Sequence, residues 1–144
     1  MKFIVLVPAN KDSEAGVMPT SHELEEMGKF NEQLVKAGIM LAGEGLHPTS
    51  KGARMTFGGG GKPAVKDGPF TESKELFAGF WILQAKSKEE VLEWMSRAPF
   101  PAGTTLEIRQ VFSAEDFAPA DPTGKHREFE EKLRQEVEKQ QRSS

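Results

Sequence analysis

The chain has 144 residues and a mass of 15.9 kDa, with 37% hydrophobic residues, 28% charged residues and a formal net charge of −3. These values are typical of one soluble globular domain, and the slight negative charge disfavours nucleic acid as a partner. The sequence contains no cysteine, which excludes disulfide bonds, thiolate zinc sites and cysteine nucleophiles and suits the reducing cytoplasm. Three isolated histidines predict no metal site, and nothing in the composition indicates a cofactor.

The first third of the chain predicts a strand followed by a helix. The apolar run over residues 3–7 is too short for a signal peptide or for a membrane helix, which needs roughly 20 apolar residues. No other stretch approaches that length, so we expect no membrane segment. Thr20 and Glu23 have the spacing of a capping box, which starts a helix that Gly38 ends. The predicted apolar face of this helix contains Leu24, Met27, Phe30, Leu34 and Ala37.

Five further strands are predicted by apolar or alternating runs. They cover residues 39–42, 53–57, 63–66, 77–84 and 105–112. Glu44, between Gly43 and Gly45, is predicted to lie in a tight turn, or else the two glycines let a ligand or another strand approach closely. Gly79 predicts a bulge or a close backbone approach in the strongest of these strands. The glycine-rich residues 58–62 close a hairpin and lack the Ser or Thr and the following helix of a phosphate-binding loop.

A second helix and a charged C-terminal helix complete the chain. Ser87 and Glu90 start the second helix as another capping box, and Pro99 ends it. Its inward-facing residues are predicted to be Val91, Leu92, Trp94 and Met95. We expect a domain over residues 1–117, followed over 118–144 by a linker and a charged helix. The apolar stripe of this last helix is expected to pack on the body or on a partner subunit, and it consists of Phe129, Leu133 and Val137.

The order of these elements predicts an α+β fold. Two strand–helix–strand repeats, with the hairpin between them, give a ferredoxin-like antiparallel sheet with both helices on one face. The other sheet face would leave apolar side chains open to water, so we expect a second copy of the chain to cover it. The predicted assembly is a homodimer of the α/β-barrel type, with a C-terminal helical extension on each chain.

One nine-residue segment carries a family resemblance. It reads Asp67-Gly68-Pro69-Phe70-Thr71-Glu72-Ser73-Lys74-Glu75 and directly precedes the strongest strand. The segment resembles the motif of the DGPF (DGPFAETKE) family, which is part of the YCII-related group. It differs from that motif at two residues. The similarity extends over about residues 1–113, including the opening strand and the helix through Trp94. The resemblance implies a bacterial protein of the dimeric α/β-barrel type, from a family often encoded beside extracytoplasmic-function sigma factors.

Two interpretations of the motif are open. In the first it is a structural corner, in which Asp67 and the following glycine form a turn, the proline fixes the exit direction and Phe70 enters the packing. In the second it is a functional site, in which Asp67 and Glu72 point into a cleft with Lys74. One carboxylate is then a general base, and the ammonium group stabilises developing negative charge.

His22, in the first turn of the first helix, is singled out by the resemblance. Other YCII-related proteins have a histidine at this helix start, proposed to form an active-site pair with an aspartate further along the helix. The histidine matches His22, but Lys36 stands where the carboxylate is expected. Asp67 or Glu44 takes the place of this acid, or the pair is absent and His22 is a solvent-exposed residue. His22 and Asp67 are therefore the candidate catalytic residues.

The remaining candidates are ligand-binding residues. The predicted set is Glu44, Arg54, Phe70, Glu72 and Lys74. Arg54 and Arg109 lie on predicted strands and are candidate anion binders in the cavity between the sheets of the dimer, or else they pair with nearby glutamates. His47 and His126 are isolated from each other, and we interpret both as loop or surface residues.

Two functions from different classes follow. The first is a protein that binds or acts on a small organic molecule in a cleft of the dimer, as the resemblance to small dimeric enzymes implies. Such an enzyme would be cofactor-independent and would use acid–base residues. The alternative is a non-enzymatic regulatory or ligand-sensing module linked to sigma-factor-type transcriptional regulation, with the C-terminal helix docking a partner protein. A partly apolar pocket favours the first function, and a filled interior favours the second.

Overall fold

The computed structural model describes residues 1–71 and 75–143 of the chain. The motif residues Glu72 and Lys74 lie outside this described part. The chain forms two compact units, Met1–Gln110 and Val111–Ser144. Among the described helices, none is both long enough and apolar enough to cross a membrane.

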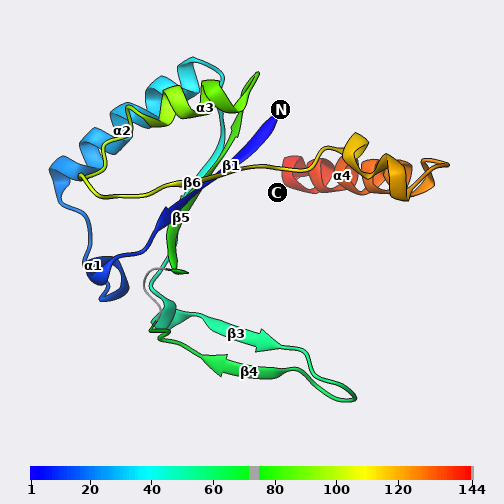
Figure 1. The fold of residues 1–144 in the computed structure, drawn as a ribbon, viewed down its shortest axis with the longest axis horizontal. Coiled ribbons are helices and arrows are strands. Elements are labelled where there is room, and N and C mark those ends of the chain that lie inside the picture. The colour runs from blue at the N-terminus through cyan, green and yellow to red at the C-terminus, as the bar shows by residue number, and fades with distance from the viewer. Residues whose placement is uncertain (72–74, 144) are drawn as a thin grey trace. The chain divides into compact units, whose positions relative to one another are not determined.

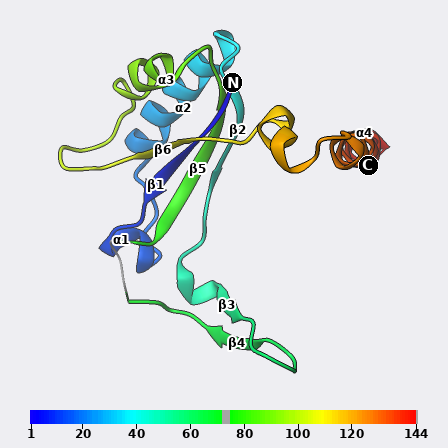
Figure 2. The same cartoon turned by 45° about the vertical axis from the view of Figure 1, so that its right-hand side comes forward.

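The first unit is built on a four-stranded antiparallel sheet. Its strands, in the spatial order β2-β5-β1-β6, are β1 (Lys2–Pro8), β2 (Met40–Gly45), β5 (Phe77–Gln84) and β6 (Glu107–Gln110). Helices α2 (Ser21–Lys36) and α3 (Lys88–Met95) lie on one face of this sheet (Figures 1 and 2). This order and this layering are those of the ferredoxin-like arrangement, so the predicted α+β fold is confirmed.

The core lies between the sheet and the two helices. Its buried residues are Phe3, Val5, Phe30, Leu34, Ile39, Trp81, Leu83, Ala85, Val91 and Met95. Three predictions about the helix faces are wrong, because Leu24 is 57% exposed, Leu92 is 47% exposed, and Ala37, which follows the end of α2, is exposed as well. At 3.6 residues per turn, Leu24 lies about 120° around its helix from Phe30, and Leu92 lies about 100° from Val91. Apolar spacing alone therefore overestimated the width of both buried faces.

Hydrogen bonds at the helix ends agree with the capping signals. Thr20 Oγ1 accepts a hydrogen bond from the backbone N–H of Glu23 at 3.1 Å, and the Glu23 carboxylate accepts one from the N–H of Thr20 at 3.3 Å. Gly38 follows α2 with a φ of +71°, a conformation that favours glycine. Ser87 Oγ accepts a hydrogen bond from the N–H of Glu90 at 3.2 Å at the start of α3, whereas the reciprocal bond of the predicted capping box, from the N–H of Ser87 to the Glu90 carboxylate, is not formed. These contacts fix where each helix begins and thereby which residues face the sheet.

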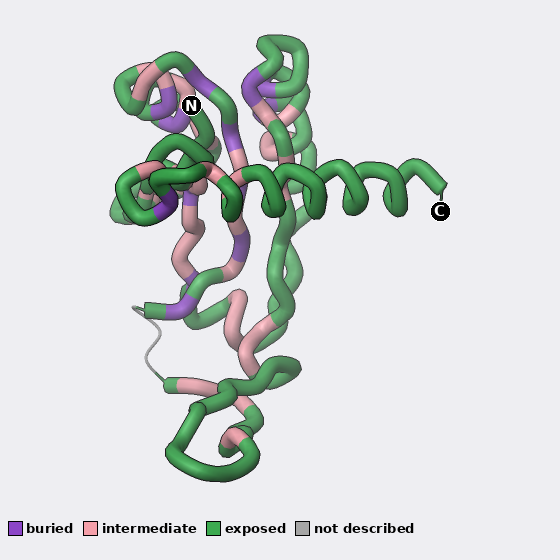
Figure 3. Tube along the Cα trace, turned by 90° about the vertical axis from the view of Figure 1, so that its right-hand side faces the viewer, coloured by how far each residue is buried: buried purple, intermediate pink, exposed green. Residues whose placement is uncertain are grey.

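A separate two-stranded sheet is formed by β3 (Ala53–Thr56) and β4 (Ala64–Asp67), which confirms the predicted hairpin. Every residue of these two strands is exposed, and the exposed colour covers most of this hairpin in Figure 3. The sequence pattern does not predict two short helices, α1 (Lys11–Glu14) and η1 (Thr49–Lys51). Each is about one turn long, which is too short to leave a helical periodicity in the sequence.

The second unit consists of the helical turns η3 (Ala114–Ala120) and the helix α4 (Lys125–Ser143). Among its described residues no apolar side chain is buried, and Asp121 is the buried residue, at 5% exposed. The last strand of the first unit ends at Gln110, so Phe112, predicted to belong to that strand, lies beyond it and is 72% exposed. The predicted stripe of α4 is 45–60% exposed, and its packing partner stays a prediction.

Candidate functional site

A cavity of about 330 Å³ lies between α2 and the β2–β5 side of the sheet. Its principal lining residues are Met27, Asn31, Gly43, Gly45, Trp81 and Phe100. All of the lining residues belong to the first unit, and most of their side chains are apolar. The volume falls within the range of pockets that hold small organic molecules, about 300–1,000 Å³.

Glycines shape the strand walls of this cavity. A Cβ atom on Gly43 would lie 2.9 Å from Trp81 Cδ1, so this position has no room for a side chain. A Cβ atom on Gly79 would lie 2.9 Å from the carbonyl oxygen of Glu44 on the neighbouring strand, which confirms the predicted close backbone approach. A Cβ atom on Gly45 would meet nothing within 4 Å. Gly45 therefore leaves open space, whereas the other two glycines permit close packing.

The turn predicted around Glu44 is wrong, because residues 43–45 are the last residues of β2. Gly43 pairs with Trp81, and Glu44 pairs with Phe80, so these neighbouring side chains point to opposite faces of the sheet. The Cβ direction of Gly43 is the one that meets the Trp81 ring on the helix side. Glu44 consequently lines the cavity with its backbone and directs its carboxylate to the other face. The alternative prediction, a close approach by a second strand, is confirmed.

Trp81 and Asn31 form the polar contact of the cavity. Trp81 is 4% exposed, and its indole Nε1–H donates a hydrogen bond to Asn31 Oδ1 at 2.9 Å. The indole ring packs edge-on against Phe30 and Phe100, each with ring centroids 6.0 Å apart. A buried indole N–H requires an acceptor, and Asn31 supplies it. Neither residue was predicted from the sequence as a site residue. The available signal was the tryptophan itself, whose ring N–H needs an acceptor when it is buried in the strongest predicted strand.

The motif corner is tied to the preceding loop. The N–H of Gly68 donates a hydrogen bond to the carbonyl of Gly52 at 3.0 Å, and a Cβ atom on Gly68 would lie 1.7 Å from the carbonyl oxygen of Thr49. Thr49 Oγ1 accepts a hydrogen bond from the N–H of Phe70 at 3.0 Å and donates one to the Glu14 carboxylate at 2.5 Å. These contacts support the interpretation of the motif as a structural corner, because they use its backbone rather than its charges.

Two predicted ligand-binding residues meet at this corner. The guanidinium carbon of Arg54 lies 3.9 Å from the ring centre of Phe70, which is a cation–π contact. Arg54 is on β3, in the hairpin, and so it does not lie on a face of the four-stranded sheet. The predicted partners Glu72 and Lys74 lie outside the described residues.

His22 and Asp67 are both exposed, His22 in the first turn of α2 and Asp67 at the end of β4. Within residues 1–71 and 75–143, no hydrogen bond or ion pair joins their side chains to each other or to another residue. His22 precedes Asn31 by nine residues, which is two and a half helical turns. The two side chains therefore lie on opposite sides of α2, and His22 is not among the residues that line the cavity. Their action as an acid–base pair stays a prediction.

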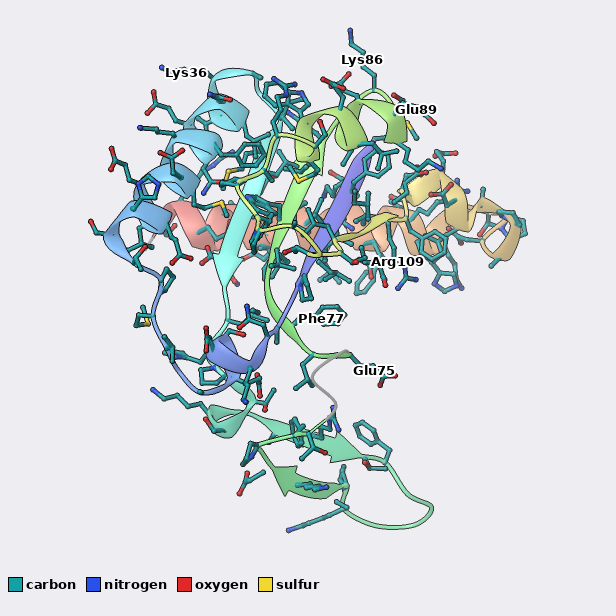
Figure 4. All side chains as sticks on the ribbon, turned by 60° about the vertical axis from the view of Figure 1, so that its left-hand side comes forward. Lys36, Glu75, Phe77, Lys86, Glu89 and Arg109 are labelled. Atoms are coloured by element: carbon teal, nitrogen blue, oxygen red, sulfur yellow. The ribbon has the colours of Figure 1, made fainter. Side chains whose placement is uncertain are left out.

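Charged groups elsewhere on α2 do not build a site. Lys36, found where a carboxylate is expected, lies at the C-terminal end of α2 and pairs with Glu32, with 2.7 Å between Nζ and Oε1 (Figure 4). The hydrogen bond from Lys36 lowers the pKa of the Glu32 carboxyl. The described part of the chain contains no group of three or more side chains placed to hold a metal ion.

The sheet face away from α2 and α3 is apolar at its centre. Ile4 pairs with Ile82, and Leu6 pairs with Phe80, at positions that alternate with the buried residues of β1 and β5. Each of these four side chains is partly exposed. Arg109 of β6 pairs in register with Ile4 and flanks this cluster (Figure 4). The four residues form the open sheet face, for which the sequence predicts a second copy of the chain.

The second unit has a hollow of its own, of about 490 Å³, whose lining includes Phe112 and Phe117. Beside it, Asp121 accepts hydrogen bonds from the backbone N–H groups of His126 and Arg127 at 3.2 and 3.0 Å. Burial raises the pKa of the Asp121 carboxyl, but these hydrogen bonds outweigh burial and hold its pKa below the usual value. The two aromatic rings are 72% and 50% exposed. The cavity of the first unit has the buried Trp81 in its wall and is therefore the stronger candidate site.

Known proteins are similar to this chain in sequence and in structure. The chain is 29% identical over 89 residues to an uncharacterised protein of Rhizobium meliloti (strain 1021), across 60% of this chain and 70% of that protein. It is also similar to the structure of 5-chloro-2-hydroxyhydroquinone dehydrochlorinase of Burkholderia phenoliruptrix AC1100 in complex with 2,5-dihydroxybenzoquinone. That similarity covers 80% of this chain and 98% of the other chain, at 21% identity and a TM-score of 0.37. The profile of the YCII-related domain matches residues 1–115, and the chain therefore belongs to the YCII-related domain family.

Proposed function

We propose that the chain binds a small organic molecule in the cavity between α2 and the sheet. The observation that carries this proposal is the cavity itself, with about 330 Å³ of space and mainly apolar walls. A concave site with apolar walls and few polar groups is the usual form of a small-molecule pocket. The position of Gly45 supports the proposal, because a Cβ atom there would meet nothing within 4 Å, and the wall of the cavity therefore has open space at this residue.

The apolar walls set the expected strength of binding. A ring compound that buries about 200 Å² of apolar surface gains roughly 5 kcal/mol, at about 25 cal/mol per Å². The loss of translational and rotational freedom offsets part of this gain. Dissociation constants weaker than about 0.2 mM are therefore expected for simple probe compounds.

The proposal includes a homodimer formed through the open sheet face. A two-fold axis would place the cluster of Ile4, Leu6, Phe80 and Ile82 of one copy against the same cluster of a second copy. Burial of these side chains removes apolar surface from water on both copies. The cavity lies on the helix side of the sheet, so assembly through the open face leaves it accessible.

A matched pair of variants tests the binding proposal. A library of neutral ring compounds is titrated into ¹⁵N-labelled protein, and the indole N–H signals of Trp81 and Trp94 are followed by NMR. Gly45→Leu places a side chain in the open space of the cavity wall, whereas Gly28→Ala is the control, because a Cβ atom at this exposed helix position also meets nothing within 4 Å. We expect saturable shifts of the Trp81 signal in the wild type and in Gly28→Ala, and binding about tenfold weaker in Gly45→Leu.

Two results of this screen contradict the binding proposal. One is the absence of any saturable shift of the Trp81 signal in the wild type across the library. The other is equal affinity of the wild type and Gly45→Leu for every compound that binds, because such a compound occupies a different place.

Acid–base catalysis by His22 and Asp67 is a separate proposal, which rests on the match of His22 to the active-site histidine of other YCII-related proteins. The variants His22→Ala and Asp67→Asn are expected to bind probes as the wild type does, because neither residue lines the cavity. Since neither residue lines the cavity, this proposal places their chemistry outside it, and both variants are expected to lose turnover of any compound that the wild type converts there. Turnover that is unchanged in both variants would remove these residues from the catalytic machinery.

The same compounds distinguish an enzyme from a ligand-sensing module. Conversion of a bound compound, detected in the same NMR samples over hours, favours the enzyme. Saturable binding without conversion favours the ligand-sensing module, which is the alternative function.

A further inference from the structure

The side-chain amide of Asn31 is held in one orientation. Its Oδ1 accepts the indole N–H of Trp81 at 2.9 Å, and this contact decides which end of the amide is the oxygen, because an amide nitrogen cannot accept that proton. The Nδ2 group, with two N–H donors, consequently occupies the other branch of the amide. Within the described part of the chain, these donors have no hydrogen-bond acceptor.

Asn31 also stands apart chemically from the rest of the cavity wall. The lining residues include no lysine, arginine or histidine, and the one carboxylate, that of Glu44, points to the other face of the sheet. The indole N–H of Trp81 is already bonded to Asn31. The Nδ2 donors of Asn31 are thus the side-chain groups of this wall that are left to bind a ligand oxygen.

The absence of a cation among the lining residues decides the charge of the ligand. A carboxylate that enters an apolar cavity loses its hydration and gains no opposite charge, which is far more costly than the transfer of a neutral carbonyl group. A neutral carbonyl oxygen needs only a donor, and Asn31 provides one. A cation would find no carboxylate among the side chains that face the cavity, since that of Glu44 points to the other face of the sheet.

We propose that the cavity selects uncharged ring compounds that carry a carbonyl oxygen, and that Asn31 Nδ2 donates the hydrogen bond to this oxygen. This inference rests on the proposed function, because it names the ligand class of the same cavity. The ring lies against the apolar wall that includes Met27 and Trp81, and the oxygen lies at the amide of Asn31. Asn31 is thereby a specificity-determining residue.

Asn31→Asp is the test variant. Aspartate has nearly the same shape, keeps an oxygen for the indole N–H of Trp81 and lacks the Nδ2 donors. Three probes are titrated at pH 7.5, each below its solubility limit: acetophenone carries the carbonyl, ethylbenzene has the same skeleton without it, and benzoate is an anion. Affinities are measured from the Trp81 indole N–H signal, which is assigned with the variant Trp94→Phe.

The expected result is a coupling between the variant and the carbonyl group. Asn31→Asp should weaken acetophenone binding about three- to tenfold more than it weakens ethylbenzene binding, which corresponds to one neutral hydrogen bond. Benzoate should bind the wild type at least about tenfold more weakly than acetophenone does. If Asn31→Asp also abolishes ethylbenzene binding, the same ratio is measured with Asn31→Ala.

Failure of this inference is distinguishable from failure of the proposed function. If ethylbenzene and acetophenone bind the wild type but lose equal affinity in the variant, or if benzoate binds as tightly as acetophenone, the assignment of Asn31 is overturned while binding in the cavity stands. If none of the three probes shifts the Trp81 signal, binding in the cavity fails, and the inference fails with it.

Discussion

Two glycines on the same face of β2 are predicted to respond in opposite ways to the same substitution. In Gly43→Ala the new Cβ atom would lie 2.6 Å from Met40 Cε and 2.9 Å from Trp81 Cδ1. The Met40 methyl group ends a flexible side chain and can move, but the indole ring is 4% exposed and is packed against Phe30 and Phe100. Overpacking of this kind costs about 1–3 kcal/mol of folding free energy.

Gly45→Ala meets no atom within 4 Å and needs no unusual backbone conformation. The substitution should raise the free energy of unfolding by about 0.4–1 kcal/mol, because alanine has less freedom than glycine in the unfolded chain. The two variants should therefore differ by roughly 1.4–4 kcal/mol, although both change a glycine of the same strand to alanine.

Urea unfolding followed by tryptophan fluorescence measures this difference. With an m-value of about 2 kcal/mol per molar, the two midpoints should lie roughly 0.7–2 M apart, with Gly45→Ala the more stable variant. Both variants and the wild type are compared at one protein concentration, because a dimer links stability to concentration. Coincident midpoints, or a lower midpoint for Gly45→Ala, would refute the assignment of close packing to one glycine and open space to the other.

Three further predictions concern the motif corner, the second unit and the open sheet face. Thr49→Val should lower the free energy of unfolding by about 1–3 kcal/mol, because the two hydrogen bonds of the Thr49 hydroxyl are lost. Thr49→Ser keeps the hydroxyl and should match the wild type in urea unfolding. An equal loss of stability in both variants would show that the hydroxyl does not stabilise the corner. The carboxylate of Asp121 has a lowered pKa, so its stabilisation of the start of α4 is complete above the usual value of 3.8 and is lost as the pH falls through the lowered pKa. Asp121→Ala should abolish the hydrogen-exchange protection of the His126 and Arg127 amides at neutral pH, and retained protection would contradict the cap. Ile82→Lys should convert a dimer of the 15.9-kDa chain to a monomer in light scattering, and an unchanged mass would place the dimer interface elsewhere.

Most of the fold follows from local signals in the sequence. The capping pair Thr20 and Glu23, the stop at Gly38 and the alternation along β5 each depend on residues close together in the chain, and all three are present in the structure. The misassigned residues are those whose environment is set by other elements. Leu24 matches the helical spacing but lies beyond the edge of the face that the sheet covers.

The site could not be predicted to the same extent, because its contacts join distant parts of the chain. Asn31 and Trp81 are 50 residues apart, and their hydrogen bond exists only once α2 lies on the sheet. Gly43 and Gly45 are equivalent in the sequence, and only the position of the Trp81 ring makes one crowded and the other open. The charged residues of the motif suggest a site in the sequence, whereas backbone and hydroxyl contacts hold its corner in the structure.

The most direct test of the account is the location of a bound probe. Intermolecular nuclear Overhauser effects are measured between the tightest-binding neutral ring compound and protein uniformly labelled with ¹³C and ¹⁵N. Contacts are expected from the ring protons of the probe to the Met27 methyl group and to the Trp81 indole, because both residues line the cavity. Contacts instead to the rings of Phe112 and Phe117, or to the open sheet face alone, would contradict binding in the cavity.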